Sequence, residues 1–179
     1  MRARLAILAS GVSVELREIV LQQKAPEFLA SSPKGTVPVL VTPTVVIEES
    51  FDVMLWALER SDPDGWLAMP EAGYDWIARC DGPFKTALDH TKYAVRYPDL
   101  DPEQERGRAA EFLADLDLQI AGSDWLFGPK CTLADMAIVP FVRQFANSDR
   151  SWFDAQPWPN LQSWLSGFFA SDRFAAIMT

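Results

Sequence analysis

A proline stands directly before a β-branched apolar run in the segment Ser32-Pro33-Lys34-Gly35-Thr36-Val37-Pro38-Val39-Leu40. Proline lacks an N–H, so it is confined to the first residue or the edge of a strand, and Pro38 must begin or border the strand that follows. The Val37–Pro38 bond in such a turn is a candidate cis peptide. In that geometry the N–H and C=O of Val37 face outward, where they would pair with an extended peptide ligand.

Glu49 and Ser50 follow the next apolar run and open a helical pattern that continues to Arg60. The first amides of a helix have no intrahelical partners, so a carboxylate, a hydroxyl and open N–H groups meet at this point. Two interpretations stay open, simple helix capping and ligand binding. The position of the pair after the Val–Pro turn favours binding.

The composition excludes several classes of function. The chain of 179 residues is 49% hydrophobic and 23% charged, which is typical of a globular protein. Its formal charge of −9 disfavours nucleic acid and anionic membranes as partners, because both require a basic surface. Two separated cysteines, Cys80 and Cys131, indicate a reducing compartment without a disulfide framework. With His90 as the only histidine, we expect no metal site, and no apolar run approaches the length of a membrane span.

The polar cluster Ser61-Asp62-Pro63-Asp64-Gly65 divides the chain into two compositions. Before this cluster, short β-like runs alternate with helical patterns. The sequence there predicts a half-buried strand at 14–19, a helix at 26–31, a hairpin of 39–41 with 45–47, and a helix at 50–60.

After the cluster, every segment has helical spacing. The predicted helices are 70–97 with a kink or break at Gly82-Pro83, 102–120, 136–145 behind a capping box at Thr132–Asp135, and 159–170. Asp172 opens a last short turn that ends at Met178. The fold class is therefore α/β plus all-α, with domains at 1–61 and 66–179.

Three motifs, in this order, resemble the glutathione S-transferase superfamily over almost the whole chain. They are Ser32–Leu40 with Glu49-Ser50, Asp124-Trp125-Leu126-Phe127-Gly128 leading into Thr132-Leu133-Ala134-Asp135, and Trp164-Leu165 with Phe174-Ala175-Ala176-Ile177-Met178. The resemblance, to bacterial members of omega-like or Cys/Ser type, implies a thioredoxin-like N-terminal domain followed by a helical-bundle C-terminal domain. It also implies glutathione as co-substrate, a small electrophilic or disulfide second substrate, no metal, a cytoplasmic location and a homodimer.

The resemblance also implies roles for individual residues. Val37 would pair through its main chain with the cysteinyl part of glutathione, with Pro38 setting the direction of that pairing. Glu49 and Ser50 would hold the γ-glutamyl end, since its amine needs a carboxylate and its carboxylate suits a helix N-terminus. Lys24 resembles the lysine that approaches the glycyl carboxylate in omega-like members. A solvated lysine without a ligand is the alternative interpretation of Lys24.

The polar and aromatic stretch Asp81–Tyr97 has two interpretations. Its charged residues recur at helical spacing, which is typical of a solvated face with weak ion pairs. By the resemblance, the same stretch would form a wall of the pocket for the electrophile.

The chain departs from the family pattern at its start. In members that begin like this one, a strand and a Cys-Pro-aromatic-Ala or Ser-Pro segment come just before an x-Arg-x-Arg motif, which Met1-Arg2-Ala3-Arg4 matches. We therefore expect an incomplete thioredoxin-like domain that lacks its first strand, and no catalytic residue in the chain as written. Either Met1 is internal to a longer protein, or this form persists by rearrangement or association. Two functions stay open, glutathione conjugation or thiol transfer by the full-length form, and a non-catalytic interaction or stress-associated module.

Overall fold

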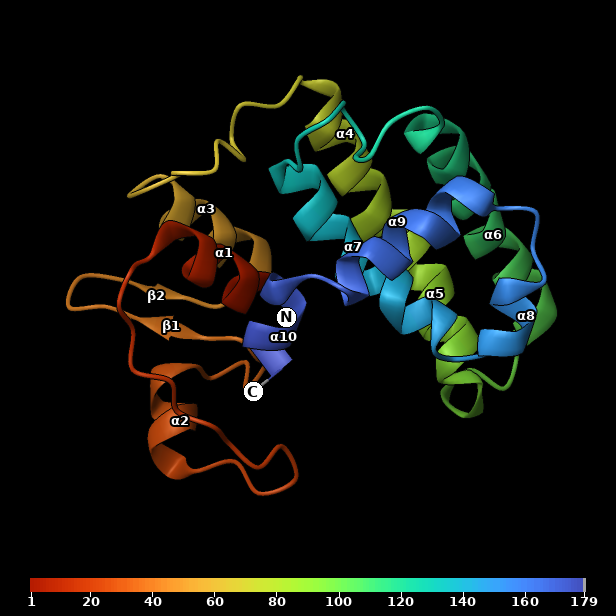
Figure 1. Cartoon of the computed structure of the whole chain (residues 1–179). Helices are drawn as coiled ribbons and strands as arrows, with labels where there is room; N and C mark the ends of the chain where they lie inside the picture. Colours follow the sequence, from red (N-terminus) through yellow and green to blue (C-terminus); the bar gives the residue numbers. More distant parts are fainter. Residues whose placement is uncertain (179) are drawn as a thin grey trace. The chain divides into compact units, whose positions relative to one another are not determined.

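The computed structural model describes residues 1–178, which divide into two compact units at Gly65 and Trp66. Both strands among the described residues lie in the first unit, whereas the second unit is built from helices (Figure 1). Each unit has its own buried apolar core.

The first unit is organised around a short hairpin. Its elements are α1 (Arg2–Ser10), α2 (Pro26–Ser31), β1 (Leu40–Val41), β2 (Val46–Ile47) and α3 (Ser50–Leu58). Helices α1 and α3 pack against each other, and the hairpin lies between them and α2 (Figure 1). The core of this unit consists of side chains that are at most 1% exposed, namely Leu5, Ala6, Val53, Met54, Ala57 and Leu58.

The predicted hairpin is confirmed. Strands β1 and β2 are antiparallel, with Leu40 opposite Ile47 and Val41 opposite Val46. The side chain of Thr42 closes the turn, since its Oγ1 accepts from the N–H of Val45 at 2.9 Å and donates to the carbonyl of the same residue at 2.9 Å. A threonine at the first turn position therefore sets the register of the two strands.

The predicted strand at 14–19 is wrong. The segment forms no ladder, and Leu16, which the alternating pattern places on a buried face, is 63% exposed. A strand needs a neighbour for its main-chain groups, and among residues 1–178 the paired strands are β1 and β2, which pair with each other. Alternation of apolar and charged residues is therefore not sufficient to form a strand in this segment.

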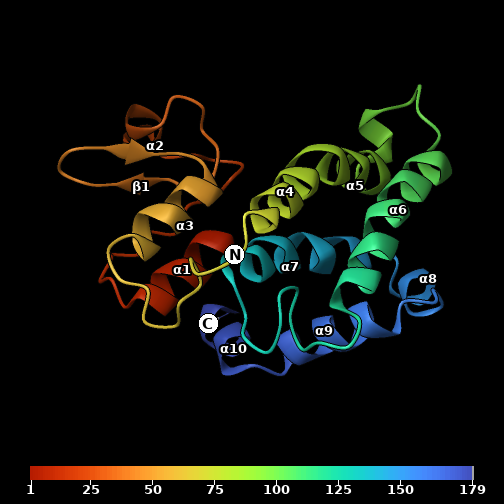
Figure 2. The ribbon, with the colours of Figure 1, turned by 90° about the horizontal axis from the view of Figure 1, so that it is seen from above.

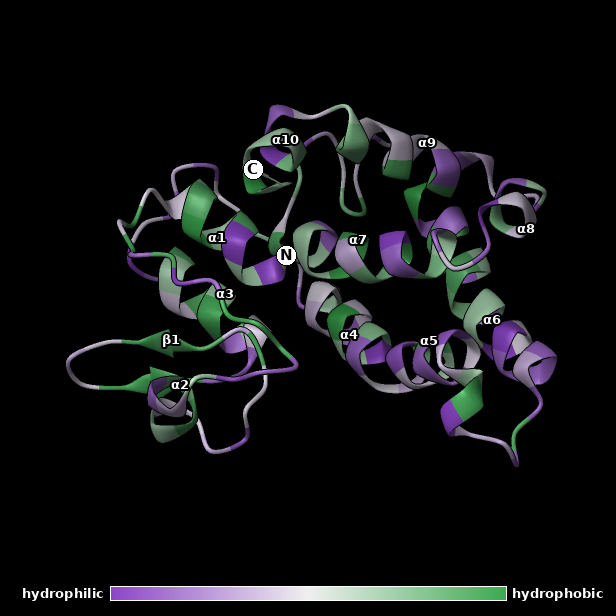
Figure 3. Ribbon diagram, turned by 90° about the horizontal axis from the view of Figure 1, so that it is seen from below, coloured by the Kyte–Doolittle hydropathy of each residue, from purple (hydrophilic) through white to green (hydrophobic). Residues whose placement is uncertain are grey.

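Apolar surface is also exposed on the hairpin, where Val41 is 58% exposed and β1 is coloured as hydrophobic in Figure 3.

The second unit is a helical bundle. Its elements are α4 (Ala72–Arg79), η1 (Cys80–Phe84), α5 (Lys85–Lys92), η2 (Ala94–Arg96), α6 (Pro102–Ile120), α7 (Leu133–Ala146), α8 (Arg150–Asp154), α9 (Pro159–Phe169) and α10 (Asp172–Met178). Helix α7 packs against α4, α5 and α9, and Figure 2 shows it between α4 and α9. Eight consecutive residues of α7, Leu133–Pro140, are buried, so this helix forms the centre of the bundle.

The structure refines the predicted helices in two places. The interruption at Gly82-Pro83 is a π-helical turn, η1, that joins α4 to α5 without ending the helix. Proline removes one backbone donor, and a wider turn accommodates that loss. Helix α8 was not predicted; it begins where the carboxylate of Asp149 accepts from the N–H of Trp152 at 3.0 Å.

Helix α7 begins at a capping box, as predicted. The N–H and hydroxyl of Thr132 both donate to Oδ2 of Asp135 at 2.8 Å. The next amide, that of Leu133, donates to the carbonyl of Trp66 at 2.9 Å. The start of the central helix is thus tied to the beginning of its own unit.

No helix within residues 1–178 has the length and hydropathy of a membrane span. In the same described part of the chain, no three His, Cys, Asp or Glu side chains gather closely enough to hold a metal ion.

Candidate functional site

A tight turn leads into the predicted glutathione-binding segment. The N–H of Gly35 donates to the carbonyl of Ser32 at 2.9 Å, with Pro33 at the second position of the turn. Gly35 has a φ of 63°, a conformation that glycine adopts without steric cost. Two residues later, the Val37–Pro38 peptide bond is cis.

The main chain of Val37 is available to a ligand. The residue is 50% exposed, and within the described residues its N–H and C=O take part in no hydrogen bond. Exposed and unpaired main-chain groups next to a strand are the feature that an extended peptide uses to dock.

Glu49 and Ser50 lie at the start of α3. Glu49 is the N-cap residue, and Ser50 is the first residue of the helix. Neither side chain caps the helix, because the N-cap makes no side-chain hydrogen bond and the hydroxyl of Ser50 has no partner among the described residues. The first helical bond runs from the N–H of Val53 to the carbonyl of Glu49 at 3.0 Å. The amides of the first turn and the hydroxyl of Ser50 thus remain open to a ligand.

An ion-pair network, which the sequence analysis did not predict, connects this helix start to the turn. Lys34 Nζ lies 3.3 Å from Glu49 Oε1 and 3.9 Å from Glu48 Oε2. Ser32 Oγ donates to Glu48 Oε1 at 2.5 Å. Lys34 belongs to the segment Ser32–Leu40, but its partners are 14 and 15 residues away in sequence, so spacing alone does not reveal the network.

Lys24 reaches the same turn from the preceding loop. Its ammonium lies 3.4 Å from the position that a Cβ on Gly35 would occupy. Lys24 is exposed, as a residue that contacts a charged ligand group must be. The structure thus gathers Lys24, Lys34 and Glu49 around one turn, with Val37 directly after it.

The first unit, Met1–Gly65, contains no cysteine. The hydroxyl of Ser10 donates to the carbonyl of Ile7 at 3.0 Å and is buried at the end of α1. Cys80 and Cys131 are buried in the second unit and form no disulfide. The arrangement at the turn can hold a peptide with charged ends.

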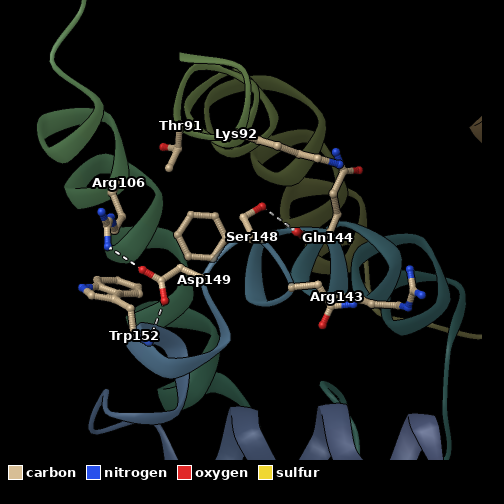
Figure 4. A pocket seen from close by; sticks show the side chains of 10 residues that line it. Thr91, Lys92, Arg106, Arg143, Gln144, Ser148, Asp149 and Trp152 are labelled. Atoms are coloured by element: carbon tan, nitrogen blue, oxygen red, sulfur yellow. Dashed lines mark hydrogen bonds and ion pairs between the residues drawn. The ribbon is translucent and has the colours of Figure 1, made fainter. Parts of the chain in front are cut away.

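A separate pocket of about 480 Å³ opens within the second unit (Figure 4). It is lined by Thr91, Lys92, Arg106, Arg143, Gln144, Phe145, Asn147, Ser148, Asp149 and Trp152. Within it, Arg106 Nη1 lies 3.3 Å from Asp149 Oδ2, and the guanidinium of Arg106 lies 5.2 Å from the centre of the Trp152 ring. None of the predicted glutathione-binding residues lines it. From the stretch Asp81–Tyr97, Thr91 and Lys92 reach it.

Comparison with family models covers both units. The model described as "Glutathione S-transferase, N-terminal domain" matches residues 1–65, and "Glutathione S-transferase, C-terminal domain" matches residues 71–167. Among curated proteins, the chain is 26% identical over 204 residues to the glutathione S-transferase-like protein gedE of Aspergillus terreus, covering 98% of this chain and 89% of that protein. It is 26% identical over 156 residues to glutathione S-transferase GstB of Escherichia coli, covering 77% of this chain and 71% of that protein.

A further relative is named as an elongation factor and not as a transferase. The chain is 25% identical over 191 residues to elongation factor 1-gamma 3 of rice, Oryza sativa, covering 93% of this chain and 46% of that protein.

Solved structures share the fold. A glutathione transferase family member from Pseudomonas fluorescens, with two glutathione molecules bound, superposes with a TM-score of 0.84 at 18% identity, covering 99% of this chain and 86% of that one. Poplar glutathione transferase F1 superposes with a TM-score of 0.80 at 16% identity, covering 99% and 90%. At these identities the likeness concerns the fold.

Proposed function

The chain belongs to the glutathione S-transferase superfamily, and from that premise we propose that its first unit binds glutathione around the Ser32–Gly35 turn. The observation that carries the proposal is the set of open groups at this turn. It comprises an exposed main chain at Val37, an uncapped helix start at Glu49 and Ser50, and the ammonium of Lys24.

Each open group matches one part of the tripeptide. The main chain of Val37, directed by Pro38, pairs with the cysteinyl residue in the manner of an added strand. Glu49 receives the γ-glutamyl ammonium, while Ser50 and the first amides of α3 receive the γ-glutamyl carboxylate, because helix N-termini attract anions. Lys24 faces the glycyl carboxylate.

We further propose the setting in which this site operates. Bound glutathione presents its thiol to a small electrophile or a disulfide, for conjugation or thiol transfer, in a cytoplasmic homodimer with domains at 1–61 and 66–179. The division of the structure after Gly65 supports these domain bounds, and the acidic charge of −9 speaks against nucleic acid as a partner. No residue of the chain is assigned to activation of the thiol.

A second function is open to the same test, because one relative is named elongation factor 1-gamma 3. In this alternative, the fold is a non-catalytic module that associates with other proteins. The two proposals differ in whether the turn of the first unit binds glutathione.

Isothermal titration calorimetry with glutathione distinguishes them. We expect saturable binding that weakens by about tenfold or more in Glu49→Ala and in Ser50→Ala, since hydrogen bonds to charged groups are worth about 1.5–3 kcal/mol. Glu59→Ala, at the opposite end of α3, is the matched control and should bind as the wild type does. Absence of binding would favour the non-catalytic module, and equal affinity in the two site variants would refute their assigned roles.

A further inference from the structure

The carboxylate assigned to the γ-glutamyl ammonium already has a cation beside it. Lys34 Nζ lies 3.3 Å from Glu49 Oε1, and both side chains are largely exposed, at 58% and 67%. A ligand ammonium that approaches Glu49 therefore meets a carboxylate already paired with an ammonium from the protein itself.

The local structure keeps Lys34 close to Glu49. Lys34 is the third residue of the turn closed by Ser32 and Gly35, so its backbone position is fixed by a 2.9 Å hydrogen bond. Glu48 lies within 3.9 Å of the same ammonium and is itself only 24% exposed. Its other oxygen accepts from the hydroxyl of Ser32 at 2.5 Å, which holds this second carboxylate in place.

Glu48 also lowers the free energy that is needed to displace Lys34 from Glu49. When a ligand takes Glu49, the ammonium of Lys34 retains Glu48 as its counter-ion and is not left without an opposite charge. A cation with two alternative carboxylates can leave one of them at little cost, because exposed ion pairs contribute little free energy each.

We propose that Lys34 is a specificity-determining residue that competes with the γ-glutamyl ammonium of glutathione for Glu49. This inference rests on the proposed function. Binding exchanges one ammonium for another at Glu49, so part of the free energy of the new ion pair is cancelled. The protein thereby discriminates less strongly between glutathione and analogues without the α-ammonium than its carboxylate alone would allow.

The test compares two ligands on two proteins by calorimetry. The ligands are glutathione and glutaryl-cysteinylglycine, which lacks only the α-ammonium. In Lys34→Met, the ratio of affinities for glutathione over the analogue should rise about two- to fivefold, the range that exposed ion pairs give. The ratio is measured in about 1 M salt, where the Debye length is about 3 Å. The analogue carries one negative charge more than glutathione, so without this screening the loss of the Lys34 charge would raise the ratio through long-range attraction alone.

Two further variants are controls for the affinity ratio. Lys130→Met removes the same charge from an exposed position in the second unit and should leave the ratio unchanged. Lys34→Arg keeps the competing cation and should restore the ratio of the wild type.

The outcomes separate this inference from the proposal beneath it. If neither the wild type nor Lys34→Met binds glutathione, the proposed function fails and the inference with it. If the wild type binds glutathione and the ratio in Lys34→Met is unchanged or lower, only the inference is overturned, and a lower ratio would show that Lys34 assists the ligand.

Discussion

The carboxylate of Asp135 accepts a hydrogen bond from the indole N–H of Trp164 at 3.2 Å, which ties the start of α7 to α9. The same carboxylate accepts from the N–H of Leu126 at 2.9 Å and from both donors of Thr132 at 2.8 Å. Asp135 is completely buried. These protein donors replace the water that the carboxylate loses on folding, so the motif around Asp135 stabilises the second unit and takes no ligand.

Asp135→Ala should destabilise the protein strongly. The substitution leaves the donors of Leu126, Thr132 and Trp164 buried without an acceptor, and each such group costs about 1–3 kcal/mol. We expect a loss of about 3 kcal/mol or more in the free energy of unfolding, measured by urea denaturation. Asp124→Ala, an exposed carboxylate at the start of the same motif, is the control and should stay within about 0.5 kcal/mol of the wild type. Equal losses in the two variants would contradict the role of the buried network.

The same residue predicts a pH dependence. Burial raises the pKa of the Asp135 carboxyl above its ordinary value of 3.8, although the hydrogen-bond donors oppose this effect. The folded state therefore holds the proton more tightly than the unfolded state. The stability that this titration contributes is complete below pH 3.8 and is lost as the pH rises through the folded-state pKa.

Asparagine at position 135 does not titrate, so the Asp135→Asn variant is the reference against which the titration of Asp135 is measured. The free energy of unfolding of the wild type minus that of Asp135→Asn should fall as the pH rises from 3.8 through the folded-state pKa, and then stay constant. Urea denaturation at a series of pH values tests this, and a difference that increases with pH would show the opposite sign.

Asp117 has a comparable role at α9. It is 6% exposed on α6, and its Oδ1 accepts from the N–H of Leu161 at 2.9 Å, in the first turn of α9. Asp117→Ala should lower the free energy of unfolding by about 1–3 kcal/mol, because a buried helix-terminal donor loses its acceptor. Asp115→Ala, on the same helix, removes only an exposed pair with Arg79 and should cost at most about 1 kcal/mol. Thermal unfolding measures both effects, and an equal fall in melting temperature for Asp117→Ala and Asp115→Ala would contradict the role of Asp117.

Gly35→Ala should affect both stability and ligand binding. Gly35 and Gly65 both have positive φ, 63° and 71°, so alanine at either position costs about 1–2 kcal/mol. At Gly35 the added Cβ would also meet Leu29 at 3.2 Å and the ammonium of Lys24 at 3.4 Å, whereas nothing lies within 4 Å at Gly65.

We therefore expect Gly35→Ala to lose more stability than Gly65→Ala. It should also weaken glutathione binding, since the added Cβ strains the turn at Gly35 and Leu29 must shift to make room for it. Chemical denaturation and calorimetry on the two variants give both comparisons. Glutathione affinity equal to that of the wild type in Gly35→Ala would contradict the role of this turn in the binding site.

Features that depend on nearby residues were predictable from the sequence. The helix Pro102–Ile120 and the hairpin around Thr42 follow from periodicity and turn residues within one short window, and both are confirmed. The family and its two-part fold, a thioredoxin-like unit followed by a helical unit, followed from three motifs in order and are also confirmed. Helix α8, with five residues, is too short for periodicity to reveal.

Features that depend on distant partners were not predictable. The pattern at 14–19 has strand character, but whether it pairs is decided by a neighbour that the pattern does not contain. Within the candidate site, the positions of Glu49 and Ser50 at a helix start follow from local sequence. The contact of Lys34 with Glu49 depends on how the turn and the hairpin return the chain to the same place, which is a property of the tertiary structure.

The most direct test of the account is a two-dimensional amide NMR spectrum of isotope-labelled protein titrated with glutathione. We predict saturable shifts at the amides of Val37, Ser50 and Phe51, since these lie at the exposed main chain and the uncapped helix start. The amides of Asn147 and Ser148, in the pocket of the second unit, should not change. Shifts confined to that pocket, or no shifts at glutathione concentrations that saturate related transferases, would contradict the assignment of the Ser32–Gly35 turn as the glutathione site.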